Sequence, residues 1–594
     1  MIQFIKISNS NPLESDMPMK KLLSLASIFF IIGCGGGGGG SDESTISYAP
    51  TKSNQTLSSS EYSVSIKKVD KSNVITSNTL IYDETKGYAI KTFYGSTALT
   101  VRTNSPRDVY LVLTNSSSNS DINSIQEQEW QKALKSKTYQ KVLDYRINFK
   151  KYLAKENPED QEDEEETFNY ERRFKSVGDK KSFFLDQNGE KTTTTTLRLT
   201  RTVNTAFGDK TLNIYVSDDS FDDGNGCPKE FCVTQEMVDV LADKFLKSGS
   251  DNDIYDWETN IYGEEWGADA SEKVDSKLIG DNDEITILLT DIDGDNDSKR
   301  GIIGYFWAKD NLTNIKGSNK EIMFYIDSVM YANHANRDTW TPDQKMPMEV
   351  LSTLAHEFQH MISFYQKTVL IGKGASSTTW LDETLSCATE YILSSKIKTF
   401  TPRQVSYEDG SAGDFPISDG QFPDFNKYLN SYNLMSWRNT AAQYGGAYAL
   451  GAYLVQNYGG AKLLHNIMHN QYFDERALLK GIKTTTGESL SLRDLLNRCG
   501  TAITISDQIL DPIDDKPYLF NSGDYNCQSY NATTYCMGSI NFFNYNPKPN
   551  FTTAKDGDIL SGSNRYVYLQ YDVDGDYNIA LNLGEGVMAT VIVK

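Results

Sequence analysis

The hydrophobic pattern divides the chain into three regions, two with a β pattern and a mixed region between them. Residues 41–206 carry short runs in which apolar and polar side chains alternate, for example 98–102 and 109–113, with turn residues between them. A period of two is typical of half-buried strands, so we predict an N-terminal all-β domain of the sandwich type. Residues 511–594 return to a Tyr-, Asn- and Gly-rich β pattern, which predicts a small C-terminal β domain.

Residues 207–510 instead mix strand-like and helix-like segments. Apolar runs at 212–216, 285–289 and 321–326 predict strands. Met237, Leu241 and Phe245 recur every four residues and predict a helix over 233–246. Further helices are expected at 347–366, 381–395, 441–458 and 461–470. The central region is therefore expected to be an α+β domain, and the 594-residue chain a multidomain protein.

The first 40 residues have the pattern of an export signal. A basic start at Lys20 and Lys21 precedes an apolar run over 22–32, which is too short to span a bilayer but suits a signal peptide. The run ends in Gly33-Cys34, which resembles a bacterial lipoprotein box, and glycines follow at 35–40 as a flexible linker. We expect a mature chain that starts at a lipidated Cys34. It would be anchored to the outer membrane or cell surface, or released outside the cell.

Charge and cysteine content fit this location. The 58 basic and 80 acidic side chains give a net charge of −22, which argues against binding nucleic acid or an anionic membrane face. No other apolar stretch approaches 18 residues, so we expect any membrane attachment to be by the lipid alone. We also expect a monomer. Six cysteines remain after Cys34, and an exported protein can pair them. The natural local bridges are 227/232 and 527/536, which leaves 387/499, but the connectivity stays open.

One pentapeptide carries recognisable chemistry. His356-Glu357-Phe358-Gln359-His360 is an H-E-x-x-H sequence inside the helix predicted over 347–366. Four helical residues advance about 400°, so His356 and His360 share one face and are suited to bind one zinc ion. Glu357 lies one step round the helix, where it reaches a zinc-activated water as general base. The core side of this helix is a separate stripe, formed by Leu351, Leu354, Phe358, Met361, Ile362 and Tyr365.

A catalytic zinc ion needs a third protein ligand. The extended histidine motif is absent, because Ser363 and Gln366 stand where its glycine and last histidine would be. The next helix begins at 380–386, and Glu383 is the best candidate for the third ligand. Glu390 is the alternative, seven residues further on the same face. We interpret Asp382 as an acid that stabilises the N-terminus of this helix.

These motifs resemble the hyicolysin family of secreted zinc metallopeptidases. The resemblance lies in LAHEFQHMI at 354–362, WLDE at 380–383, DIDGD at 291–295, GYFW at 304–307 and SNKEIMFYID at 318–327. It implies a thermolysin-like, gluzincin catalytic domain with zinc on His356, His360 and Glu383. It also implies that Tyr444 donates to the oxyanion, although an aromatic stripe that packs a core helix explains Tyr444 as well. One departure is Cys387, where thermolysin-like enzymes place an aspartate that orients a histidine.

The expected function is zinc-dependent hydrolysis of peptide bonds in protein or peptide substrates. Strand 321–326 is expected to be an edge strand that pairs with an extended substrate. The alternative function is a surface adhesin or binding lipoprotein that retains a metallopeptidase scaffold. Calcium is a further candidate ligand, because Asp291, Asp293, Asp295 and Asp297 alternate along one loop, and a solvated turn is the alternative there. His465 and His469 repeat the four-residue spacing without a glutamate, which favours a surface helix.

Overall fold

The computed structural model describes residues 62–69, 78–117, 137–154, 175–280, 283–335, 339–398 and 421–594. All of them belong to one compact unit. The predicted export signal, Cys34 and the glycine linker lie outside the described residues. Within the described ranges, no helix has the length and apolar character needed to cross a bilayer.

A six-stranded mixed sheet forms the base of the central region. Its strands are β5 (Lys180–Phe184), β6 (Thr192–Thr205), β7 (Gly208–Ser217), β8 (Glu284–Thr290), β9 (Gly304–Phe306) and β10 (Ile322–Asp327), in the order β5-β6-β7-β8-β10-β9. The parallel neighbours β8 and β10 are almost fully buried, which explains why their sequences are continuous apolar runs. The predicted strands at 212–216, 285–289 and 321–326 are confirmed.

The position of strand 321–326 in the sheet differs from the prediction. β10 pairs with β8 on one side and with β9 on the other, so it is an interior strand. The edge strand on this side of the sheet is the three-residue β9, which ends at Phe306. An apolar run marks a buried strand, but it does not reveal whether a short neighbour completes the sheet beyond it. The prediction that 321–326 is the edge is therefore wrong, and β9 takes that place.

Helices cover the sheet and extend away from it. They are α4 (Gln235–Phe245), α5 (Ile254–Tyr262), α6 (Ser328–Tyr331), α7 (Lys345–Ser363), α8 (Thr379–Ile397), α9 (Gln421–Lys427), α10 (Ala441–Tyr458), α11 (Gly460–Met468), α12 (Glu475–Thr486) and α13 (Leu492–Thr504). The predicted helices are confirmed, with ends shifted by a few residues. α7 accepts Pro347 in its first turn, where no intrahelical N–H is needed, and continues as the π-helical segment η7 (Phe364–Ile371). α8 packs against both α7 and α10.

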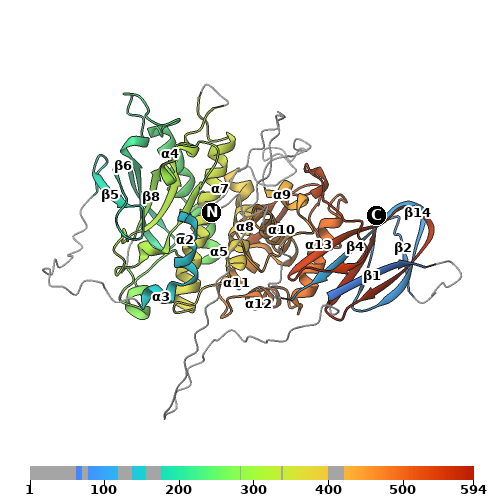
Figure 1. Ribbon diagram of the computed structural model, residues 1–594. Helices are drawn as coiled ribbons and strands as arrows, with labels where there is room; N and C mark the ends of the chain where they lie inside the picture. The colour runs from blue at the N-terminus through green and yellow to red at the C-terminus, as the bar shows by residue number, and fades with distance from the viewer. Residues whose placement is uncertain are drawn as a thin grey trace, which may run out of the picture. The chain divides into compact units, whose positions relative to one another are not determined.

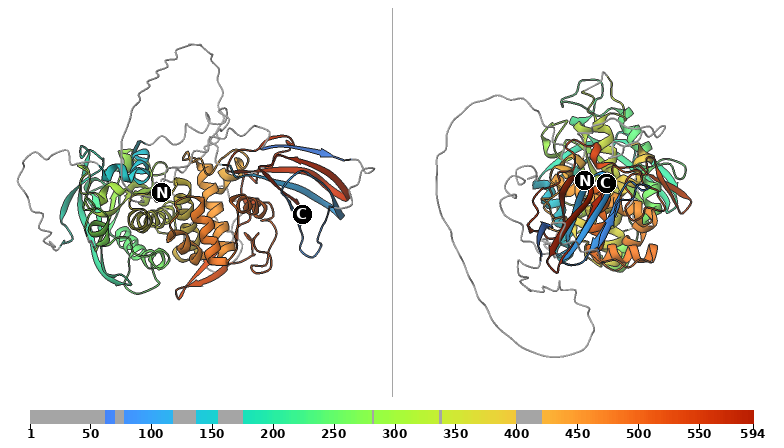
Figure 2. Two further views of the ribbon diagram at one scale, coloured as in Figure 1. Left: turned by 90° about the horizontal axis from the view of Figure 1, so that it is seen from below. Right: turned by 90° about the vertical axis from the view of Figure 1, so that its right-hand side faces the viewer.

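The strands near the two ends of the chain form one sheet. The strands are β1 (Ser63–Lys68), β2 (Thr79–Ile81), β3 (Ala89–Phe93), β4 (Thr97–Asn115), β13 (Gly557–Asp558), β14 (Ser563–Leu583) and β15 (Val587–Val593). Their order is β13-β1-β14-β4-β15-β3, with β2 beside β4. Blue N-terminal and red C-terminal strands consequently alternate in Figures 1 and 2. This differs from the predicted division into β domains at 41–206 and 511–594, because alternation within a strand does not reveal a partner more than 400 residues away.

Two short helices lie where the sequence pattern predicts only strands. They are α2 (Lys137–Ile147) and α3 (Phe149–Leu153), coloured cyan in Figure 1. Their buried positions include Val142, Tyr145, Phe149 and Leu153, which follow a helical spacing of three to four residues. The stripe is short and lies within a Thr- and Ser-rich region, so the β pattern around it hides the signal. Residues 180–205, also assigned to the N-terminal β domain, belong instead to β5 and β6 of the central sheet.

Four of the six cysteines form disulfides. Cys227 bonds to Cys232, and Cys527 bonds to Cys536 between β11 (Asn526–Tyr530) and β12 (Thr533–Met537). Both local bridges are confirmed. The two remaining cysteines, Cys387 and Cys499, are free and buried, so no third bridge joins them.

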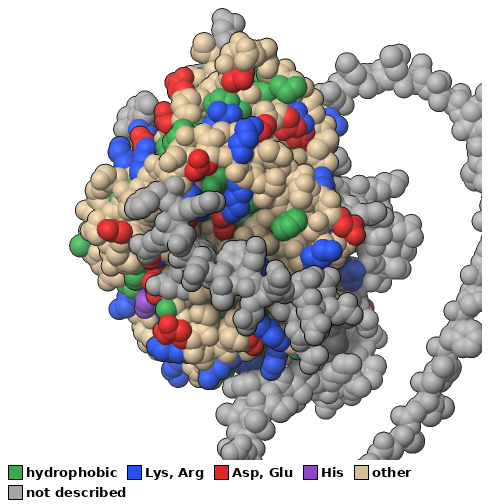
Figure 3. Space-filling model, turned by 90° about the vertical axis from the view of Figure 1, so that its left-hand side faces the viewer, with side chains coloured by type: hydrophobic (Ala, Val, Ile, Leu, Met, Phe, Trp, Pro, Cys, Tyr) green, Lys and Arg blue, Asp and Glu red, His purple; other side chains and the backbone are tan. Residues whose placement is uncertain are grey.

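Charged side chains are mixed on the face of the molecule shown in Figure 3. Lys and Arg side chains lie among Asp and Glu side chains there, and hydrophobic side chains occur in small, separate groups. The net charge of −22 is therefore not gathered into one acidic patch among the described residues of this face.

Candidate active site

Helix α7 brings the two motif histidines together. His356 and His360 lie one turn apart, and their ring centroids are 4.7 Å apart. Both side chains are buried, with 0% and 2% exposure. They face α8, whereas Phe358 and Ile362 pack on the other side among the aromatic and aliphatic side chains of the core. The helix therefore has a core face and a separate face that carries the two histidines, as the residue spacing predicts.

Helix α8 presents Glu383 to both histidines. The Oε2 atom of Glu383 lies 3.2 Å from Nε2 of His356 and 3.6 Å from Nε2 of His360. Glu383 is 1% exposed, so these three atoms meet in a buried position. The side chains come from two helices that are adjacent in sequence and packed face to face.

This donor set fits a zinc ion. A tetrahedral ion about 2.0–2.1 Å from each ligand places its ligand atoms about 3.3 Å apart. The two distances from Glu383 to the histidine nitrogens bracket that value. Two neutral imidazoles and one carboxylate are also the donor types that a catalytic zinc site of this class uses. His356, Glu357 and His360 together form a group of metal-binding atoms within 4.8 Å of one another.

Two further carboxylates hold the histidine rings from behind. Glu390 lies 2.7 Å from Nδ1 of His356, and Asp382 lies 3.1 Å from Nδ1 of His360. A carboxylate at Nδ1 fixes the proton on that nitrogen and directs Nε2 toward a metal. Glu390 therefore occupies the position of an orienting residue, in place of the aspartate that Cys387 replaces. Asp382 does lie in the first turn of α8, as expected, but the sequence pattern does not predict its contact with His360.

The charges around this cluster favour ionised acids and a neutral histidine. Burial alone would raise the pKa of Glu383, but His360, His356 and Arg146 outweigh it and hold that pKa well below its usual range. Burial opposes ionisation of Asp382 too, and its pKa is nevertheless lowered, chiefly by His360. Burial lowers the pKa of His356, which keeps the ring neutral and its Nε2 lone pair available.

Glu357 is held by the edge strand. The backbone N–H of Phe306, the last residue of β9, donates to Oε2 of Glu357 at 2.9 Å. The Glu357 side chain is buried, with 2% exposure. The general base predicted from the motif is thus fixed between helix α7 and the strand that borders the sheet.

Tyr444 lies in the first turn of α10 and is buried. Its ring packs edge-to-face against Trp437, with centroids 5.0 Å apart. This contact fits the packing alternative, and the role of Tyr444 as an oxyanion donor stays a prediction.

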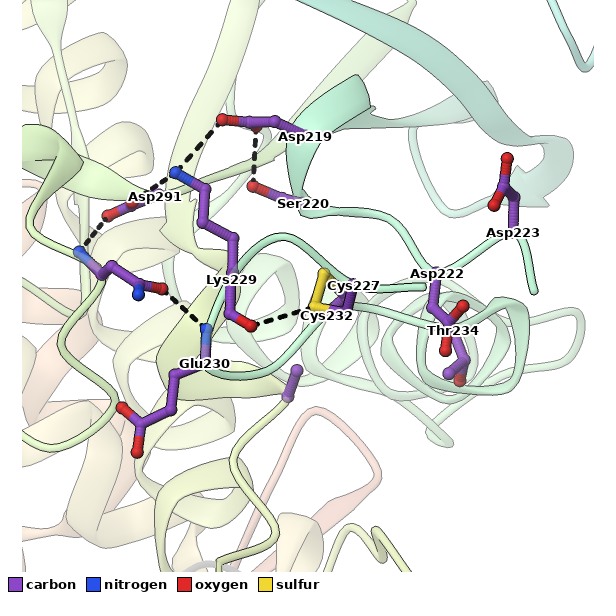
Figure 4. Close-up of a disulfide and its surroundings, with 12 residues drawn as sticks. Asp219, Ser220, Asp222, Asp223, Cys227, Lys229, Glu230, Cys232, Thr234 and Asp291 are labelled. Atoms are coloured by element: carbon purple, nitrogen blue, oxygen red, sulfur yellow. Dashed lines mark hydrogen bonds and ion pairs between the residues drawn. A yellow bond between two sulfur atoms is a disulfide. The ribbon is translucent and has the colours of Figure 1, made fainter. Parts of the chain in front are cut away.

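The acidic loop after β8 contacts a lysine that lies in the loop closed by the Cys227–Cys232 disulfide. The Nζ atom of Lys229 lies 2.8 Å from Asp291 and 3.1 Å from Asp219, and Lys229 is inside the Cys227–Cys232 loop (Figure 4). Asp297 accepts from the backbone N–H groups of Lys299 and Arg300. A cation is thus already supplied to Asp291 by the protein, and calcium at this loop stays a prediction.

The other paired histidines have structural partners. The ring nitrogens of His465 and His469 lie 2.8 and 3.0 Å from the carbonyl oxygens of Ile261 and Tyr262. Burial lowers the pKa of His469 to about 4, so this ring is neutral at physiological pH. The pair therefore joins α11 to the end of α5.

Together, two helices and an edge strand bring the H-E-x-x-H residues and Glu383 into one buried cluster, with the donor types that metallopeptidases use. A family model described as Peptidase M30 matches residues 189–510, which is more than half of the chain. The chain belongs to this family. This confirms the resemblance to the hyicolysin family.

Relatives and solved structures show similarity over part of the chain. The neutral metalloprotease ShpI of Staphylococcus hyicus is 24% identical over 263 residues, 43% of this chain and 55% of that protein. The chain thus spans about half the length of this curated relative. An M1 zinc metallopeptidase from Deinococcus radiodurans is 12% identical, with 69% of this chain and 64% of that chain covered and a TM-score of 0.21. A mutant form of that enzyme, bound to a Tyr-Ser-Ala substrate, is 13% identical, with 72% and 69% covered and a TM-score of 0.21.

Near the candidate metal site, α5 buries a carboxyl group, that of Glu258. It is 0% exposed, and neither of its oxygens has a hydrogen-bond partner among the residues that the structure describes. Burial, and then the charge of Glu390, raise the pKa of Glu258 well above its usual value. The folded chain therefore keeps a proton on Glu258 at pH values where the unfolded chain has lost it.

Glu258→Gln is expected to flatten the pH dependence of stability. The wild-type contribution is fully present below the unfolded pKa of about 4.5, and it is lost progressively as the pH rises from there through the raised folded pKa. One proton released on unfolding corresponds to a slope of about −1.4 kcal/mol per pH unit, which the variant lacks. Urea unfolding of zinc-free protein between about pH 5.5 and 7.5 measures this slope. Glu236→Gln on the exposed side of α4 is the matched control, and equal slopes in all three proteins would contradict the prediction.

Proposed function

We propose that this chain is a zinc-dependent endopeptidase that hydrolyses peptide bonds of protein substrates. The observation that carries the proposal is the meeting of His356, His360 and Glu383 at distances suited to one zinc ion. Membership of the Peptidase M30 family and the similarity to a neutral metalloprotease support it. The central region would then be a thermolysin-like, gluzincin catalytic domain that extends over about 207–510. β5 and β6, which precede it in the sequence, extend its sheet.

His356, His360 and Glu383 would hold the zinc ion. When bound, zinc supplies Lewis-acid polarisation of the scissile carbonyl and lowers the pKa of a water molecule. Glu357 takes the proton of the attacking water and later delivers it to the leaving amine. The N–H of Phe306 keeps one oxygen of Glu357 fixed, so the other oxygen is directed to the proton transfer. Tyr444 is proposed to steady the oxyanion.

The edge strand β9 is the natural place for the substrate backbone. β9 has one paired side, toward β10, and its last residue touches the general base. An extended peptide that pairs with the other side of β9 would bring a peptide bond beside Glu357. Binding of this kind uses hydrogen bonds to the substrate backbone, which suits an enzyme that cleaves within protein chains.

The proposed location follows from the sequence. We propose an exported protein that is lipid-anchored through Cys34 to the bacterial cell envelope, or released from it.

The second candidate function is a surface adhesin or binding lipoprotein that retains a metallopeptidase scaffold. The sheet formed by strands from both ends of the chain would offer it a further binding surface. The intact Glu357 and both histidines favour the enzyme.

Zinc content and its removal test the proposed function. The full chain is expected to bind one zinc ion per molecule, as measured by elemental analysis. Removing zinc with a chelator should abolish casein hydrolysis, and added zinc should restore it, because the proposed ligands stay in the chain and can bind the ion again. Hydrolysis that survives complete metal removal would contradict the proposal. Protein that binds no zinc would favour the adhesin.

A further inference from the structure

Helix α2 places an arginine against the candidate metal site. The guanidinium of Arg146 lies 3.0 Å from Oε1 of Glu383 and 3.3 Å from Oδ2 of Asp382. The side chain of Arg146 is 10% exposed, so the ion pair is largely shielded from water. Arg146 contacts the outer oxygen of Glu383, and the other oxygen faces the two histidines. The arginine therefore leaves the metal-facing atom available.

Aromatic contacts dock α2 and α3 beside the edge strand. Tyr145 meets Trp307, the residue after β9, with ring centroids 6.1 Å apart. Phe149 packs edge-to-face on Phe364 at the end of α7, with centroids 4.7 Å apart. The two helices consequently bridge the border of the sheet and the C-terminal end of the motif helix.

Polar contacts hold both ends of the same segment. Thr138 in α2 donates to Asp293 of the acidic loop at 2.7 Å. At the end of α3, the carbonyl oxygen of Leu153 accepts from Lys277 at 2.7 Å, and that of Tyr152 accepts from Asn314 at 3.1 Å. The segment 137–154 is thus fixed along its whole length.

The docked helices close the approach to the metal site. Leu143, Arg146 and Ile147 form one wall of a small pocket whose other walls include His360 and Asp382. With α2 in place, the motif histidines, Glu357 and Glu383 are at most 2% exposed. A polypeptide substrate bound at the proposed zinc site would need the space beside these side chains. The segment also precedes residue 189, where the family match begins, so it lies outside the matched region.

We infer that α2 and α3 form an intramolecular latch that closes the zinc site, and that Arg146 holds it shut. The inference rests on the proposed function, because the latch blocks the same site. It makes the chain a latent peptidase, which is active only when residues 137–154 move away from the zinc site. A charge at position 146 that repels Asp382 and Glu383 should release it, whereas zinc loading should proceed with the latch closed.

The test uses the full zinc-loaded chain and a peptide hydroxamate, a probe that binds zinc in peptidase active sites. Arg146→Glu is expected to bind the hydroxamate about 10–100-fold more tightly than wild type by calorimetry, because apparent affinity scales with the open fraction. Lys141→Glu, the same charge change on the exposed side of α2, is the matched control and should bind like wild type. Zinc content should be equal in all three proteins, and casein hydrolysis should rise with hydroxamate affinity.

Hydrogen exchange on wild type gives a second measurement that needs no variant. Saturating hydroxamate is expected to speed amide exchange over 137–153, although a bound ligand ordinarily slows exchange around its site. Tight binding with α2 still protected would overturn the latch and leave the peptidase proposal intact. Lower zinc content in Arg146→Glu would also overturn it, since Arg146 would then position Glu383. Failure of wild type and both variants to bind either zinc or hydroxamate would count against the proposed function itself.

Discussion

Glu357→Gln is expected to lower kcat for casein by about 10²–10⁴-fold, the range for loss of a general acid–base group. Glutamine keeps the size of the side chain and still accepts from the N–H of Phe306, but it takes up no proton. The zinc ligands are untouched, so zinc content should stay at one ion per chain. The loss should appear in kcat rather than in KM, because the carboxylate acts in the chemical step.

The comparison is made in wild type and in Arg146→Glu, so that a closed latch does not hide the effect. Glu349→Gln is the matched control, with the same change about 12 Å earlier along α7. It should retain activity. Casein hydrolysis that persists in Glu357→Gln, with zinc bound, would show that another group serves as base.

Local features of this chain could be predicted from its sequence. The spacing of His356 and His360 follows from the helical period alone, and the same period reveals the extent of α10 and the core face of α7. The disulfides at 227/232 and 527/536 join residues that are close in sequence. In each case, the residues that carry the information lie close together in the sequence, within the length of about one to five helical turns. A single sequence therefore contains it.

Features that depend on distant partners could not be predicted. The pairing of β4 with β14 joins residues more than 400 positions apart, and no local pattern specifies it. β9 is only three residues long, so its role as the edge strand has no periodic signal. Arg146 reaches Glu383 across 237 positions. A stripe at Val142, Tyr145 and Phe149 could have revealed the helix, but not its docking site.

The carboxylates around the histidines could be predicted only in part, because their positions in the sequence are a local feature and their contacts depend on how two helices pack. Glu383 and Glu390 are both recognisable from the sequence as acids on one face of α8, seven residues apart. Which of them faces the metal depends on how α8 packs against α7. The structure puts Glu383 at Nε2 of both rings and Glu390 at Nδ1 of His356, so the two acids have different expected roles.

Glu383→Gln is therefore expected to weaken zinc binding far more than Glu390→Gln. Loss of a charged ligand should raise the zinc Kd by more than about 1,000-fold, because the site keeps only two protein donors. Loss of a carboxylate that orients a ligand should raise the Kd by about 10–100-fold. Competition with a chromogenic chelator measures both values at one pH.

Asp382→Asn is the matched comparison for Glu390→Gln, since each change removes the carboxylate behind one histidine. Its Kd should rise by a similar factor of about 10–100. Activity should follow zinc occupancy in both of these variants and return at high zinc concentration, whereas Glu383→Gln should recover little. Equal losses of zinc affinity in Glu383→Gln and Glu390→Gln would mean that the third ligand is not Glu383, because a ligand and an orienting group contribute unequally to the binding of one ion.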